Sequence, residues 1–142
     1  MNKVNPISEY LNYVEKTGSR RKLYELVAKE YNIISAIYPG SYIDIDPSLF
    51  IEKVIYIDNF KKTNKFFSNI DMIQEYIKTN KLYENEPYVE FIFEDYNKLK
   101  GIDKVDLIIS QYAGFVGNAT KQFLRTGGIF LANDSHGDAS LA

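Results

Sequence analysis

The chain has 142 residues, and 45% of them are hydrophobic, which suits one domain with one core. Its formal net charge is -2 and no long basic run occurs, so the composition gives no strong signal for nucleic-acid binding. Because cysteine is absent, disulfides and thiolate metal sites are excluded, and the cytoplasm is the expected location. No apolar stretch reaches about 18 residues, so we expect no membrane span.

Two helices are expected first. Ser8 is predicted to cap the helix Glu9–Lys16, and Ser19 is predicted to cap Arg20–Tyr31, because a serine oxygen accepts hydrogen bonds from the free amide groups at a helix start. We expect both helices to cover the sheet that follows them. The alternative is that the arginine pair at the start of the second helix, Arg20 and Arg21, faces a substrate.

The next segment has the pattern with which a nucleotide-binding site begins. The apolar run Ile33–Ile37 is typical of a strand covered on both faces, and it ends in the turn Tyr38–Ser41. The second predicted strand, Lys53–Ile57, ends at the carboxylate of Asp58. A strand, a tight glycine turn, a second strand and a terminal acid begin a binding site in a doubly wound α/β sheet.

The rest of the chain alternates predicted helices and strands. The predicted helical segments are a short helix capped by Asp46 with Pro47 in its first position, residues 61–80, and Gly114–Leu124. The later predicted strands are Tyr88–Phe93, Val105–Ser110 and, after a helix stop at Arg125–Gly127, Gly128–Ala132. This alternation predicts a parallel sheet with right-handed crossovers. We expect a single domain over residues 1–142, with N-terminal helices over 1–31 and a Rossmann-like core over 32–142.

Five segments carry a family resemblance. In chain order they read AIYPGSY, VIYID, FIFEDY, VDLIISQYAGF and FLRTGGIFLAND. Together they resemble the class I S-adenosylmethionine-dependent methyltransferases over about residues 20–142. The resemblance implies a three-layer α/β/α Rossmann-like sheet with strand order 3-2-1-4-5, C-terminally truncated because the family's last two strands are not expected here. It also implies S-adenosylmethionine as cofactor and a methyl acceptor that the sequence leaves unknown.

The resemblance also implies which residues hold the cofactor. They are Tyr38, Gly40, Ser41, Asp58, Asp95, Tyr96 and Ser110. Asp58 would accept hydrogen bonds from both ribose hydroxyls, as a carboxylate at a strand end is able to do. Asp95 would contact the adenine amino group and Tyr96 would stack on the ring. The alternatives are a plain turn at Gly40, a loop acid or helix cap at Asp58, and turn chemistry at Asp95.

The acceptor would lie nearest Ser110, Gln111 and Asn133, which are the candidate catalytic residues. Glutamine is a poor general base at neutral pH, so Gln111 would orient an acceptor rather than deprotonate it. The segment lacks the prolines that amino methyltransferases of the family often carry here. That difference counts against methylation of nucleobase amines or of glutamine by that scheme.

Two departures from the family pattern keep other functions open. Tyr38 stands where the family has an acid, and one glycine, Gly40, stands where it has three. Because glycine lets backbone approach a ligand closely, this change favours a non-catalytic interaction protein that retains the fold as the alternative. A third candidate, an NAD-dependent enzyme, is disfavoured because no G-x-G-x-x-G pattern follows the first strand.

The end of the chain raises two further hypotheses. Asp134, His136 and Asp138 offer a metal site or an acid–base pair, but their spacing is no specific ligand motif, so we predict a polar loop and no metal. The fifth strand is expected to have an open outer edge, exposing Ile129 and Leu131. We therefore predict a homodimer through this edge.

Overall fold

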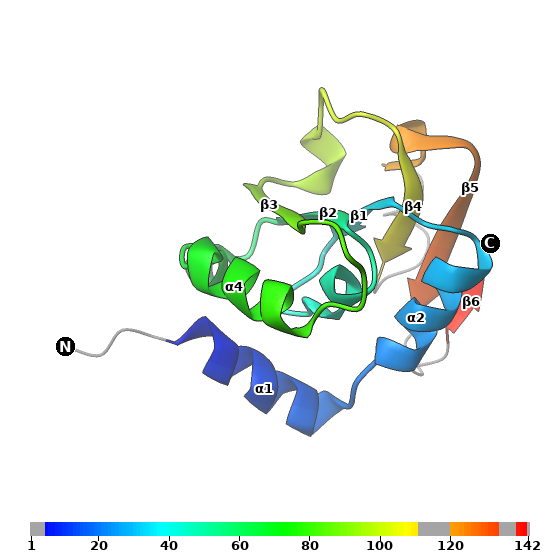
Figure 1. The fold of residues 1–142 in the computed structure, drawn as a ribbon. Coiled ribbons are helices and arrows are strands. Elements are labelled where there is room, and N and C mark those ends of the chain that lie inside the picture. The colour runs from blue at the N-terminus through cyan, green and yellow to red at the C-terminus, as the bar shows by residue number, and fades with distance from the viewer. Residues whose placement is uncertain (1–4, 111–119, 134–138, 142) are drawn as a thin grey trace.

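A computed structural model describes residues 5–110, 120–133 and 139–141. The helices are α1 (Pro6–Thr17), α2 (Arg21–Glu30), α3 (Lys61–Phe67) and α4 (Ile70–Asn80), and three 3-10 helices are η1 (Asp46–Leu49), η2 (Tyr96–Lys98) and η3 (Lys121–Phe123). The strands are β1 (Ser35–Pro39), β2 (Lys53–Asp58), β3 (Tyr88–Phe93), β4 (Val105–Ser110), β5 (Leu124–Asn133) and β6 (Ala139–Leu141). Figure 1 shows their arrangement.

The strands form one sheet in the order β3-β2-β1-β4-β5-β6. The first five strands are parallel, which confirms the predicted order 3-2-1-4-5 and the Rossmann-like fold class. β6 is antiparallel to β5 and pairs with it over Leu131–Asn133. The expectation that nothing in the chain covers the outer edge of β5 was therefore wrong over these residues.

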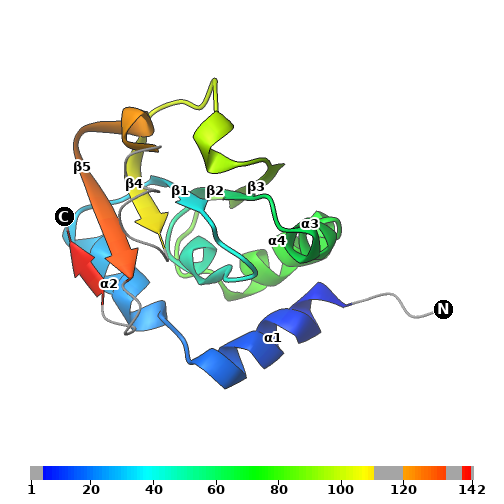
Figure 2. The same ribbon diagram turned by 180° about the vertical axis from the view of Figure 1, so that it is seen from behind.

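Each face of the sheet carries its own apolar cluster. Helices α1 to α4 pack on one face, where the largest buried rings are those of Tyr10, Tyr24, Tyr38, Tyr56 and Phe66. In the part of the chain that the structure describes, the other face is covered by η2, η3 and the connector before β4 instead of α-helices. Figures 1 and 2 show this asymmetry, with α1, α2 and α4 below the sheet and η2 and η3 above it.

The first helix begins three residues before its predicted start, and the second begins one residue after its predicted start. α1 begins at Pro6, because Asn5 accepts a 2.9 Å hydrogen bond from the Ile7 amide and proline needs no partner for its missing N–H. Ser8 is therefore not the cap. α2 begins at Arg21, and its N-cap is Arg20, which makes no side-chain capping hydrogen bond. Ser19 lies one position before the cap, although its Oγ accepts from the Arg21 amide at 3.1 Å, so Ser19 is not the predicted cap either.

β1 begins at Ser35, two residues after its predicted start at Ile33, because the amides of Ile33 and Ile34 form hydrogen bonds outside the backbone pairing of the sheet. The amide of Ile33 donates to the Ala28 carbonyl and closes the end of α2. The amides of Ile34 and Ser35 both donate to the Asp106 carboxylate, at 2.9 and 3.1 Å. At its other end, the strand includes Tyr38 and Pro39, which are predicted as part of the turn but pair with Tyr56 and Ile57 of β2.

β5 begins at Leu124 and includes the segment predicted as a helix stop. Its register against β4 shifts between Val105 and Leu107. Val105 pairs with Leu124, whereas Leu107 pairs with Ile129, so β5 has more residues than β4 over this stretch. The extra residues form a bulge in which Gly127 has a φ of 81°. The predicted helix Gly114–Leu124 falls largely on residues outside the described ranges, and its final part is η3 and the start of β5.

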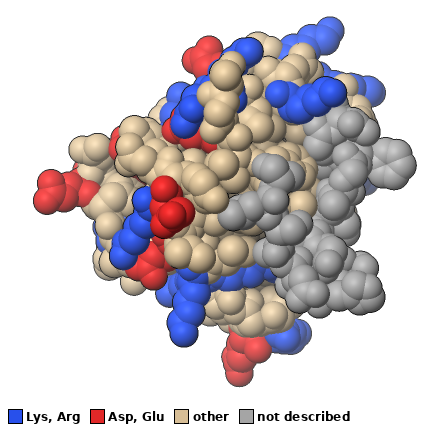
Figure 3. Space-filling model, turned by 90° about the vertical axis from the view of Figure 1, so that its right-hand side faces the viewer, with Lys and Arg blue, Asp and Glu red and all other residues tan. Residues whose placement is uncertain are grey.

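Within the described residues, none of the helices combines the length and apolar character that crossing a membrane requires. On the face shown in Figure 3, basic and acidic side chains of the described residues lie in several separate places among uncharged ones.

Candidate functional site

The carboxyl ends of the parallel strands meet at one edge of the sheet. β1 lies between β2 and β4, so the connections leave β1 on opposite sides, which is where doubly wound sheets bind ligands. At this edge the amide of Gly40 donates to the Ile57 carbonyl at 2.7 Å, one residue before Asp58. Gly40 has a φ of 68°, a conformation that glycine adopts without strain. The structure therefore brings the predicted turn and the predicted acid together.

Asp58 is half-buried, and both of its carboxylate oxygens accept hydrogen bonds. Oδ2 accepts from the amide of Tyr42 at 3.1 Å and from Thr63 Oγ1 at 3.2 Å. Oδ1 accepts from the amide of Phe60 at 3.2 Å. The carboxylate thus joins the loop after β1 to the start of α3.

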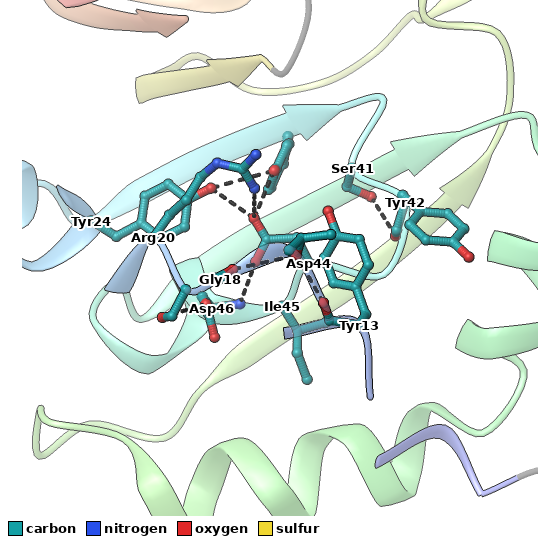
Figure 4. Close-up of polar contacts among 12 residues, drawn as sticks. Tyr13, Gly18, Arg20, Tyr24, Ser41, Tyr42, Asp44, Ile45 and Asp46 are labelled. Carbon is teal, nitrogen blue, oxygen red and sulfur yellow. Dashed lines mark hydrogen bonds and ion pairs between the residues drawn. The ribbon is translucent and has the colours of Figure 1, made fainter. Parts of the chain in front are cut away.

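Tyr42 is held over this edge in an unusual conformation. Its φ is 51°, in the left-handed region that tyrosine seldom adopts. Its ring packs against Tyr13 of α1 at 5.4 Å between centroids and against Phe60 at 6.0 Å. Its carbonyl accepts from Ser41 Oγ at 3.1 Å, and Figure 4 shows its ring directed away from the acids farther along the loop.

The first of those acids, Asp44, is a buried residue of the same loop. Its Oδ2 accepts from the hydroxyls of Tyr24 and Tyr38, each at 2.8 Å, and Arg20 lies 3.8 Å away (Figure 4). Burial and then the nearby charge of Asp46 raise the pKa of Asp44 to about 6. Tyr38, at the position of the family's acid, therefore contacts an acid supplied six residues later.

The second acid, Asp46, anchors the N-terminal helices. It accepts hydrogen bonds from the Tyr10 hydroxyl, from Ser19 Oγ at 3.3 Å and from Arg21 Nε at 3.2 Å. Arg21 also donates to Tyr10 at 2.8 Å and to Tyr76 at 3.2 Å. Burial and the bond to Asp46 raise the pKa of Tyr10, which keeps the hydroxyl protonated as a donor. The alternative in which Arg21 faces a substrate is therefore disfavoured.

The residues predicted around adenine form a turn. Asp95 precedes η2, and its Oδ1 accepts from the amide of Asn97 at 2.9 Å and from Asn97 Nδ2 at 3.1 Å. Tyr96 is half-buried and packs against the apolar cluster on the second face. These contacts are the turn chemistry that the sequence left as the alternative, and both side chains remain partly accessible at the carboxyl edge.

The candidates at the later strand ends are only partly described. Ser110 ends β4 with its side chain fully buried, and Asn133 ends β5, opposite Ala139 of β6. Gln111 and the polar residues Asp134, His136 and Asp138 lie outside the described residues. Among the residues that are described, no three His, Cys, Asp or Glu side chains come together as metal ligands.

The predicted cofactor residues thus fall into two groups. Gly40, Asp58, Asp95 and Tyr96 are half-buried, and a bound molecule is able to reach them. Tyr38, Ser41 and Ser110 are fully buried within the fold, so in this structure a bound molecule does not reach them.

Sequence reasoning missed three residues around Asp58, namely Tyr42, Phe60 and Thr63. It also missed the partners of Asp44 and Asp46. One signal was present, because Ile43-Asp44-Ile45-Asp46 alternates apolar and acidic residues while Arg20-Arg21 offers a matching pair of cations. The abundance of tyrosine also had a structural use, since Tyr10, Tyr24 and Tyr38 are the hydroxyl donors to these acids.

Comparison with known proteins supports the fold. No protein-family model and no curated protein matches the sequence. Solved structures do match: an S-adenosylmethionine-dependent methyltransferase from Clostridium acetobutylicum ATCC 824 has a TM-score of 0.62 at 12% identity, over 90% of this chain and 57% of its own. A putative caffeoyl-CoA O-methyltransferase from Staphylococcus aureus has a TM-score of 0.60 at 10% identity, over 92% and 66%.

A third match was solved with a ligand. The N-methyltransferase NodS from Bradyrhizobium japonicum WM9, in complex with S-adenosyl-L-homocysteine, has a TM-score of 0.55 at 11% identity, over 80% of this chain and 59% of its own. The chain therefore spans less than two thirds of the length of these structures. Over most of its length it has the fold of the class I S-adenosylmethionine-dependent methyltransferases.

Proposed function

We propose that the chain is a methyltransferase-like protein that binds S-adenosylmethionine at the carboxyl edge of β1 and β2, with a methyl acceptor still to be identified. The observation that carries the proposal is the pairing of the Gly40 turn with Asp58 at the point where the sheet reverses its winding. The fit is to the nucleoside half of the cofactor. Gly40 lets the backbone approach it, and Asp58 retains acceptor capacity for a ribose hydroxyl.

The other half-buried residues extend this site. Asp95 Oδ2 is available to an adenine amino group, because the bonds to Asn97 use Oδ1. Tyr96 offers its exposed part to the purine ring. When bound, the cofactor supplies an activated methyl group, and the chain's contribution is to hold cofactor and acceptor in line. Ser110, Gln111 and Asn133 remain the candidates nearest the acceptor.

A specific observation also favours the second candidate, a non-catalytic interaction protein. Tyr38 and Ser41 are fully buried, and both oxygens of Asp58 are already bonded within the chain. A stable fold that binds no nucleoside would identify this alternative.

Calorimetry with S-adenosylmethionine and S-adenosylhomocysteine tests the proposal. Asp58→Ala should lower affinity by on the order of 2–4 kcal/mol, because the charge-assisted hydrogen bonding of its carboxylate to the ribose is lost. The matched control is Asp103→Ala, which removes an exposed acid outside the site and should leave affinity unchanged.

Melting curves must accompany this measurement. Asp58 bonds Tyr42, Phe60 and Thr63, so Asp58→Ala should also weaken folding, although by less than it weakens binding. Binding is therefore compared at a temperature where each variant is folded. Equal affinity of the wild type and Asp58→Ala would show that Asp58 is only a structural acid.

A further inference from the structure

The contact between Tyr42 and Asp58 occupies an acceptor that the proposed cofactor needs. We propose that the loop from Gly40 to Asp44 is a latch, closed in this structure by the Tyr42 amide, and that S-adenosylmethionine binds only when that amide leaves Asp58. This inference rests on the proposed function and adds its regulation. It makes Tyr42 the residue that sets the affinity of the site.

Counting lone pairs on Asp58 gives the first step. Each carboxylate oxygen accepts about two hydrogen bonds. Oδ2 already accepts from Tyr42 and Thr63, so it is full, whereas Oδ1 accepts from Phe60 and has one place left. A ribose diol that binds with one hydroxyl on each oxygen therefore requires one of the two Oδ2 donors to leave.

Burial decides which donor leaves. Thr63 is fully buried, and a hydroxyl that loses its partner inside the protein costs free energy because no water replaces it. Tyr42 is half-buried, so it is the less enclosed of the two donor residues. The Tyr42 amide is therefore the donor that yields to the ribose.

The backbone of Tyr42 favours the same movement. Its φ of 51° is a left-handed conformation that is unfavourable for a residue with a Cβ, and opening returns it to an ordinary region. What holds the latch closed is the bond to Asp58 and the packing of the Tyr42 ring on Tyr13 and Phe60. The ends of the loop are suited to a hinge, because Gly40 tolerates wide rotation and Asp44 is fixed from below by Tyr24 and Tyr38.

A matched pair of substitutions separates the latch from loss of the ring. Tyr42→Val and Tyr42→Asn both remove the ring contacts, but valine is strongly disfavoured at positive φ whereas asparagine tolerates it. Calorimetry with S-adenosylhomocysteine should give a dissociation constant about five- to tenfold lower for Tyr42→Val than for Tyr42→Asn. Tyr42→Phe, which keeps the ring and the backbone preference, should match the wild type.

The outcomes distinguish the latch from the site itself. Measurable binding with equal affinity for the valine and asparagine variants overturns the latch and leaves the site in place. Absence of binding in all four proteins, each shown to be folded by melting, overturns the proposed function and the latch with it. Binding by Tyr42→Val when the wild type binds weakly supports both.

Amide NMR on the wild type gives an independent readout that requires no substitution. Saturation with S-adenosylhomocysteine should shift the Tyr42 amide resonance away from its carboxylate-bonded position, while the Ser68 amide on the far end of α3, which bonds to Asn64, stays unchanged. A Tyr42 amide that does not move at saturation contradicts the proposal.

Discussion

Two neighbouring acids, Asp44 and Asp46, are almost fully buried, but they have different partners. Asp46 faces the guanidinium of Arg21 at 3.2 Å, whereas Asp44 is bonded mainly by the neutral hydroxyls of Tyr24 and Tyr38, with Arg20 farther away at 3.8 Å. Neutral donors compensate less for the lost hydration of a carboxylate than a contacting cation does. Burial, and after it the nearby charge of Asp46, therefore raises the pKa of Asp44 to about 6.

This raised pKa predicts how stability depends on pH. Folded Asp44 binds its proton more tightly than the unfolded chain, so its contribution is fully present below pH 4 and is lost as pH rises through about 6. Asp44→Asn removes this titration. The free energy of unfolding of the wild type, relative to the variant, should fall by on the order of 2–3 kcal/mol between about pH 4 and pH 7.

Urea unfolding of both proteins at the two pH values provides the measurement. Asp58→Asn serves as the control, because it neutralises a half-buried carboxylate that lies outside the Asp44–Asp46 pair. A wild-type minus Asp44→Asn difference that is the same at both pH values would show that Asp44 stays ionised when buried.

At the residue scale, the sequence predicts which residues meet at the ends of adjacent strands better than it predicts contacts between more distant elements. Gly40 and Asp58 were placed side by side because parallel strands end at one edge, and the structure agrees. The left-handed conformation of Tyr42 was not predicted, because it depends on Asp58, Tyr13 and Phe60 together. No local pattern at Tyr42 encodes those contacts.

At the element scale, strands that are regular were predicted with their correct bounds. Tyr88–Phe93 and Val105–Ser110 are mostly apolar segments, and both are strands over those residues. β5 was predicted too short because Arg125-Thr126-Gly127 reads as a helix stop, whereas pairing with β4 includes these residues in the strand as part of a bulge. Tertiary pairing overrides the local signal there.

The bulge predicts a steric coupling between Gly128 and Leu124. A Cβ on Gly128 would lie 2.6 Å from Leu124 Cδ1 and 2.9 Å from the Arg125 carbonyl oxygen. Gly128→Ala should therefore destabilise the fold by about 1–3 kcal/mol, as overpacking does. In a Leu124→Ala background the same change should cost less, because part of the clash is gone.

Urea unfolding of the wild type, the two single variants and the double variant measures this coupling. Gly101→Ala is a useful comparison, because its Cβ meets open space and only its φ of 72° opposes the change. Strictly additive effects of Gly128→Ala and Leu124→Ala would contradict the predicted clash.

At the scale of the whole molecule, the sheet has two edges of different character. β3 forms one edge, and its Tyr88 and Phe93 are about half exposed. At the other edge β6 covers only Leu131–Asn133, so within the described residues the outer side of Leu124–Phe130 has no strand partner. The family resemblance implied the correct order of the first five strands but not β6, because a strand of three residues carries too little pattern to be predicted.

Homodimerisation through the β5 edge therefore stays a prediction, now restricted to Leu124–Phe130. Unpaired amides and carbonyls along a strand edge are able to pair with a second copy about a two-fold axis. Light scattering at micromolar concentration should then show a dimer.

Ile129→Lys is a poor test by itself, because Ile129 packs partly against the cluster under α1 to α4 and the charge would also destabilise the monomer. Hydrogen exchange at two protein concentrations avoids this difficulty, since dimerisation should protect the β5 amides more at the higher concentration while β2, inside the sheet, stays equally protected. A monomer at every concentration, with unchanged exchange in Leu124–Phe130, would contradict the prediction.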